Sequence, residues 1–153
     1  MTNLQQTLVQ VKHGLISAPE LLQSEDTHMA NLTYQQGVRA FNAKDYITAL
    51  DFFTVAVIQL PFNATYSFAL AMTYHALNEE QEAISFYIRS WLFDATNPAT
   101  CFRLGQCYLT LKEYADAVES VETAIKLAEL APEHQEILML SRQLLVEVKA
   151  RNT

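Results

Sequence analysis

Small and apolar residues recur along this chain at the three-to-four spacing of helices that bury one face. The pattern is clearest between residues 98 and 131, where two such stripes flank the polar pair Lys112-Glu113. This arrangement predicts two antiparallel helices joined by a tight turn. The two stripes are Phe102, Gly105 and Leu109, followed by Ala117, Val121 and Ala124.

The same pattern occurs three times. The sequence can be aligned with itself so that Gly37 matches Ala71 and Ala71 matches Gly105. In this alignment small residues match small residues and bulky residues match bulky residues, without gaps. We therefore predict an all-α fold of three helix pairs at residues 30–63, 64–97 and 98–131, in which small residues let paired helices approach closely. The six small packing positions are Gly37, Ala49, Ala71, Ala83, Gly105 and Ala117.

Two details follow from these patterns. In the second pair, Asn78 is predicted to cap the second helix, with Gln81 reaching back to it. Residues 132–153 are predicted to form a capping helix and tail, because a stack of repeats needs a cover for its last apolar face. The predicted buried stripe of that helix is Ile137, Leu140, Leu144 and Val148, widened by Leu138 and Leu145.

The segment before the first repeat carries a weaker signal. Leu4, Leu8 and Val11 form a short helical stripe that stops near Gly14, and a looser link containing Pro19 follows. We predict a helical arm over residues 1–29 that is too weak to be stable alone. It either docks on the repeats or pairs with a second copy of the chain.

Composition and charge narrow the possible partners. The chain has 153 residues, is 50% hydrophobic and has a net charge of −7, without a stripe of Lys and Arg. This disfavours nucleic acid and anionic membranes as partners. No apolar run is long enough for stable membrane insertion, and the N-terminus lacks the pattern of a secretory signal. Cys101 and Cys107 cannot pair on one helix, which favours a reduced, cytoplasmic setting.

The residues with reactive side chains form no catalytic or metal-binding pattern. The four histidines are scattered, and neither a phosphate loop nor a nucleophile elbow is present. A row of acidic residues at Asp116, Glu119 and Glu122 has the spacing of a solvated helix face. We therefore predict a protein that is not an enzyme and that has no metal and no cofactor.

A repeat stack offers a concave surface for binding, lined by the first helix of each pair. One inward position is aromatic in all three repeats, at Tyr34, Phe68 and Phe102. A purely structural role for Phe68 and Phe102, packed between neighbouring helices, stays open. The predicted client-binding residues are Tyr34, Val38, Phe41, Phe68, Met72, His75, Phe102, Gln106 and Leu109.

The period and the order of small and aromatic residues resemble the tetratricopeptide repeat. One class of these repeats grips a terminal carboxylate with five polar side chains. The matching positions here are Tyr34, Val38, Ala69, Ala99 and Arg103, of which only the last agrees. The groove is therefore expected to prefer an extended apolar segment of a partner.

The whole chain also resembles the class II chaperones of bacterial type III secretion. Residues 98–108, "PATCFRLGQCY", resemble that family's junction into its third repeat, and residues 41–49, "FNAKDYITA", resemble its first repeat turn. The resemblance implies a cytosolic chaperone that stabilises translocator subunits before export. It also implies a homodimer through residues 1–29, and a groove that receives an extended client segment with prolines and a leucine as anchors.

Two alternatives remain open at this stage. The repeats suit a general scaffold or assembly factor for a secretion or pilus system. They also suit an auxiliary partner of a transcription activator. Translocator and needle genes beside the chain's own gene would favour the chaperone.

Overall fold

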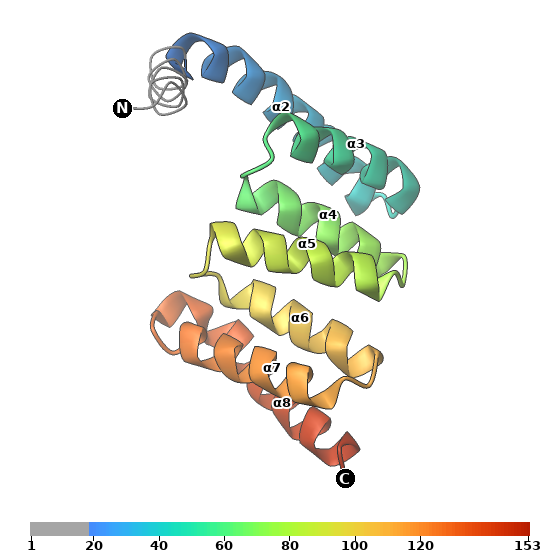
Figure 1. The fold of residues 1–153 in the computed structure, drawn as a ribbon, viewed down its shortest axis with the longest axis vertical. Coiled ribbons are helices and arrows are strands. Elements are labelled where there is room, and N and C mark those ends of the chain that lie inside the picture. Colours follow the sequence, from blue (N-terminus) through green and yellow to red (C-terminus); the bar gives the residue numbers. More distant parts are fainter. Residues whose placement is uncertain (1–18) are drawn as a thin grey trace, which may run out of the picture.

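The structure, a computed structural model, describes residues 19–153, and within this range the regular elements are all helices. Figure 1 shows the helix pairs stacked one after another along the long axis of the molecule. This confirms the predicted all-α stack of three repeats. The elements are α2 (Pro19–Asn42), α3 (Tyr46–Gln59), α4 (Ala64–Ala76), α5 (Glu80–Phe93), α6 (Pro98–Thr110), α7 (Tyr114–Ala128), the short 3₁₀ helix η1 (Pro132–His134) and α8 (Gln135–Arg151).

The turn inside each pair has the same backbone conformation. Lys44, Asn78 and Lys112 occupy the same position in successive repeats and have φ angles of 60°, 60° and 61°. This left-handed conformation ends the first helix of each pair, and asparagine adopts it at lower cost than most residues. The prediction that Asn78 caps α5 is therefore wrong: Glu79 holds the cap position, and its side chain makes no capping hydrogen bond.

The first helices of the second and third repeats begin at a capping asparagine. Asn63 accepts a hydrogen bond from the Tyr66 backbone N–H at 3.0 Å, and Asn97 accepts one from the Ala99 N–H at 3.0 Å. The equivalent position in the first repeat holds Met29, which has no side-chain oxygen to cap a helix. Helix α2 continues through this position and begins at Pro19, so the looser link predicted there is wrong. The predicted stripe nearer the N-terminus lies outside the described residues.

Small residues lie where the two helices of a pair cross. A Cβ atom on Gly37 would lie 2.6 Å from the Phe53 ring, and one on Gly105 would overlap Val121 Cγ2. A larger side chain would therefore have to push the helices apart, which a closely packed interior resists. The four alanines at the other small positions are fully buried: Ala49, Ala71, Ala83 and Ala117.

Helix α8 packs on α7 and α6 and covers the last repeat. Its buried residues are Leu138, Ser141, Leu144 and Val148. Leu140, predicted as part of the buried stripe, is 37% exposed. Leu138, Leu144 and Val148 were all predicted, and the polar Ser141 holds the buried place that the apolar pattern gave to Leu140.

The two cysteines give a first testable result. Cys101 and Cys107 are free and buried, and burial raises the pKa of Cys101 to about 11 and that of Cys107 to about 12. Since the thiolate is the reactive form, we expect an aromatic disulfide reagent at about pH 8 to label neither thiol in the folded chain. Both should react after unfolding in urea. Rapid labelling of the folded chain would contradict this expectation.

Candidate functional site

An apolar pocket of about 200 Å³ lies between the first and second repeats. Its walls come from α2, α3 and α4. Apart from Thr65 and the Tyr34 hydroxyl, the lining side chains are apolar, so the pocket suits an apolar group of a partner. The lining residues are Tyr34, Val38, Phe41, Phe53, Thr65, Phe68, Ala69 and Met72.

The aromatic walls of this pocket are held by contacts with each other. The ring centroids of Tyr34 and Tyr66 lie 4.8 Å apart in a stacked pair, and Tyr34 lies 5.6 Å from Phe53. Phe68 makes an edge contact with the buried Tyr87 at 5.5 Å. Because these rings are already fixed, a partner that enters the pocket restricts few additional side-chain rotations.

A second pocket of about 270 Å³ adjoins the first and shares Phe41 and Met72 with it. Its lining is more polar, because a histidine, a tyrosine hydroxyl and an arginine reach it. We call the two adjoining pockets the groove. The second pocket is lined by Phe41, Met72, His75, Ala76, Tyr87 and Arg103.

The imidazole of His75 is held in this second pocket by α5. Nδ1 of His75 lies 3.3 Å from the Tyr87 hydroxyl oxygen. Burial lowers the pKa of His75, and the positive charge of Arg103 lowers it further, while Glu80 acts in the opposite direction. The neutral imidazole is therefore the favoured form at neutral pH.

The lowered pKa of His75 predicts a pH effect on stability. The unfolded chain takes up this proton near the ordinary pKa of about 6.5, whereas the folded chain does so only at lower pH. Stability therefore falls as pH is lowered through this window. We expect wild type to lose more stability than His75→Asn between about pH 7.5 and about pH 5.5 in urea unfolding. An equal loss in both proteins would contradict this assignment.

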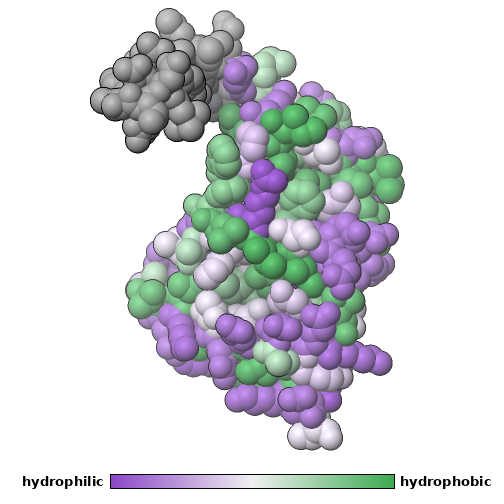
Figure 2. All heavy atoms as spheres, in the orientation of Figure 1, coloured by the Kyte–Doolittle hydropathy of each residue, from purple (hydrophilic) through white to green (hydrophobic). Residues whose placement is uncertain are grey.

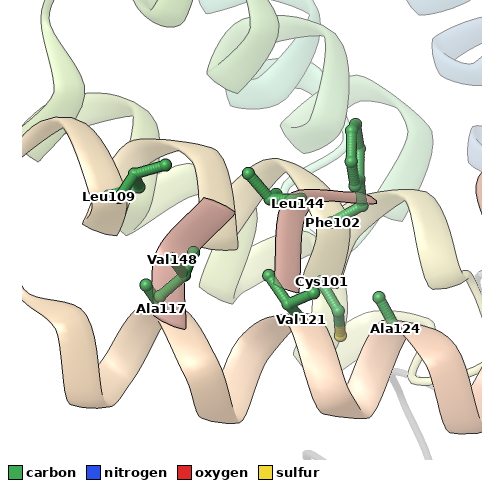
Figure 3. Close-up of a cluster of buried hydrophobic side chains, with 8 residues drawn as sticks. All are labelled: Cys101, Phe102, Leu109, Ala117, Val121, Ala124, Leu144 and Val148. Carbon is green, nitrogen blue, oxygen red and sulfur yellow. The ribbon is translucent and has the colours of Figure 1, made fainter. Parts of the chain in front are cut away.

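The third repeat differs from the first two. Phe102 and Leu109 are only 7% and 8% exposed, and α8 packs over them. Figure 3 shows their side chains in a cluster contributed by α6, α7 and α8. Gln106 accepts a hydrogen bond from Nη1 of Arg103 at 3.2 Å. The cluster consists of Cys101, Phe102, Leu109, Ala117, Val121, Ala124, Leu144 and Val148.

The structure brings six of the nine predicted client-binding residues together in the groove, and the third-repeat residues are not among them. The six are Tyr34, Val38, Phe41, Phe68, Met72 and His75. Phe53 and Tyr87 also line the groove, and neither was among the predicted client-binding residues. One feature of the sequence could have indicated these two residues, because both are large aromatic residues at the same position of successive repeats. The sequence singled out Arg103 only as the one residue that agrees with the carboxylate-gripping repeats, and did not predict it to line the groove.

Polar and apolar surfaces are unevenly distributed. Figure 2 shows hydrophobic residues concentrated over α3 to α5 and hydrophilic residues predominating over α7 and α8. Along residues 19–153, no helix is both long and apolar enough to cross a membrane. Within the same range, His, Cys, Asp and Glu side chains do not gather in threes as metal ligands would.

Comparison with known proteins identifies the repeats. A model of the tetratricopeptide repeat matches residues 98–131, and a second model of this repeat matches residues 64–90. The DnaJ homolog subfamily C member 7 of mouse is 31% identical over 110 residues, which cover 71% of this chain and 22% of that protein. The human counterpart is 30% identical over 110 residues. The chain thus spans about a fifth of the length of the curated relatives that it matches.

Solved structures with the same fold are more similar in length. A type III secretion complex from Aeromonas hydrophila has a TM-score of 0.84 at 21% identity, covering 94% of this chain and 97% of that chain. PcrH, known from Pseudomonas aeruginosa, has a TM-score of 0.80 at 22% identity, covering 83% and 96%. The translocator chaperone SycD of Yersinia enterocolitica has a TM-score of 0.79 at 19% identity, covering 82% and 87%. Residues 64–90 and 98–131 therefore carry tetratricopeptide repeats, and the chain shares the fold of the type III secretion translocator chaperones.

Proposed function

We propose that this chain is a cytosolic chaperone of bacterial type III secretion, which binds and stabilises translocator subunits before their export. An extended apolar segment of the client lies in the groove. The observation that carries this proposal is the preformed apolar pocket between α2 and α4, walled by predicted client-binding residues of two repeats. The role is binding, and it needs neither a catalytic group nor a cofactor.

Solved structures with this fold support the proposal. One is described as PcrH with the chaperone binding region of PopD, and another as SycD with a peptide of the translocator YopD. A further structure of SycD is described as an alternative dimer. By analogy, we propose that this chain forms a homodimer and that residues 1–29 contribute to its interface.

The proposed contacts are strongest in the first two repeats. Tyr34, Val38 and Phe41 present one wall, and Phe68, Met72 and His75 present the other. Burying such apolar surface stabilises a complex by about 25 cal/mol per Å². Phe102 and Leu109 offer a client little surface, because they are nearly buried under α8. Gln106 contributes to client binding indirectly, by accepting a hydrogen bond from Arg103.

Co-expression tests the proposed role directly. The chain is produced with the candidate translocators encoded beside its gene, and the complex is isolated through a tag on the chain. We propose that a membrane-active translocator co-purifies. Recovery of a transcription activator without any translocator would overturn the chaperone role, and so would recovery of pilus or secretion-assembly components alone.

A further inference from the structure

Arg103 is a charged residue in the lining of the groove. The binding of apolar client groups does not account for a charge at this place. Arg103 extends from α6 into the second pocket, beside Phe41 and Met72, and is half-buried. Within residues 19–153 its guanidinium forms no ion pair, and its hydrogen bond goes to the neutral amide of Gln106. A guanidinium partly removed from water is stabilised by a carboxylate, whose two oxygens match its geometry.

The charge of Arg103 acts inside the pocket. It lowers the pKa of the neighbouring His75 imidazole and opposes the effect of burial on the pKa of the Tyr87 hydroxyl. Glu80 is the carboxylate that acts on His75 in the opposite direction, but it does not pair with Arg103. Arg103 thus brings a positive charge into the lining of the second pocket, although the chain as a whole has a net charge of −7.

We propose that the groove selects an extended segment that carries a carboxylate side chain two or three residues from an apolar anchor, the anchor filling the first pocket and the carboxylate pairing with Arg103 in the second. This inference rests on the proposed function, because it names the kind of segment that the groove accepts. The two pockets share the walls Phe41 and Met72, so they are adjacent parts of one surface. In an extended segment, side chains return to the same face after two residues in a strand, about 7 Å, or after three in polyproline II, about 9 Å, and these are the spacings that neighbouring pockets can receive.

Blocked peptides test this selection without a known client. The probes are fluorescein-labelled peptides of about twelve residues, with a Ser and Pro background and one leucine. Glu or Gln is placed about two or three positions before the leucine in one set and after it in the other, so that both chain directions are tested. We expect the Glu peptides to bind roughly tenfold more tightly than the Gln peptides in fluorescence anisotropy, because a charged hydrogen bond replaces a neutral one. The preference should shrink as salt is added.

Arg103→Gln should abolish the preference for Glu, so that the Glu and Gln peptides bind this variant with the same affinity. The matched control is Arg39→Gln, which removes an exposed arginine of α2 that lines neither pocket and should keep the preference. Circular dichroism establishes that each variant is folded. Met72→Gln should weaken the Glu and Gln peptides alike, because this residue walls both pockets.

Each other outcome has a definite meaning. Equal binding of the Glu and Gln peptides to wild type overturns this inference and leaves the apolar groove intact. A Glu preference that survives Arg103→Gln also overturns it. Tighter binding of a Gln peptide that ends in a free carboxylate at the same place shows that Arg103 reads a chain terminus instead. Absence of binding by every peptide at millimolar concentration contradicts the proposed function itself, and this inference with it.

Discussion

Gly105→Leu is expected to lower the free energy of unfolding by about 3 kcal/mol, which for a chain of this size is a fall in melting temperature of roughly 6–12 °C. The reason is steric. Even a Cβ atom at this position would overlap Val121 Cγ2, and Leu144 Cδ2 lies 3.6 Å away. A leucine must therefore displace α7 and α8 together. Thermal unfolding followed by circular dichroism measures the change.

Helix α7 supplies a matched pair of controls. Ala117 is fully buried against Gly105, and Ala117→Leu should destabilise the chain by a similar amount. Ala115 lies on the same helix but is exposed, and Ala115→Leu should change the stability by less than about 0.5 kcal/mol. If Gly105→Leu melts like wild type, the helices do not cross where the structure places them.

Phe41→Ala combined with Phe68→Ala is expected to abolish co-purification of the client. Both rings wall the apolar pocket, on α2 and α4 respectively. The loss of one aromatic anchor often costs about 2 kcal/mol or more, so losing two should weaken binding by roughly a thousandfold. The measurement is the amount of translocator recovered with the tagged chain after co-expression.

Stability has to be separated from binding in this experiment. Phe41 packs on Tyr46 at 5.1 Å and Phe68 on Tyr87 at 5.5 Å, so the double variant also loses some internal packing. Met72→Gln keeps the size of the side chain, makes the pocket polar, and should lose the client with less effect on folding. Circular dichroism at low temperature shows whether each variant retains its helices.

A charge reversal on the outer face is the functional control. Glu119→Lys with Glu122→Lys alters α7, which contributes no residue to the groove. This variant should keep the client. If the reversal loses the client while the groove variants keep it, the binding surface lies on the opposite side of the stack.

Most of the architecture could be predicted from the sequence because each repeat solves the same packing problem. Two helices approach closely only where the facing residues of both helices are small. Small residues therefore recur in the other repeats at the positions equivalent to Gly105 and Ala117. The constant repeat period also determined which side chains of the first helices face one way. The apolar wall formed by Tyr34, Phe41 and Phe68 follows from that period.

The departures come from contacts that periodicity does not encode. The repeat pattern placed Phe102 and Leu109 with the other inward residues, but it contains no information on where α8 packs after the last repeat. Similarly, α2 extends back to Pro19, past the position where Met29 replaces the capping asparagine of the later repeats. Arg103 reaches its pocket through a long side chain, whose direction a helical pattern leaves undetermined.

The apolar pocket lies across the seam between two repeats, and this has a consequence for client release. In a linear stack each repeat is stabilised by its neighbours, so the seam is where the chain can part with the least loss of packing. An occupant that contacts both α2 and α4 adds to the coupling energy across that seam. If the groove holds a client as proposed, a bound client stabilises the first repeat against fraying, and fraying of that repeat weakens the hold on the client.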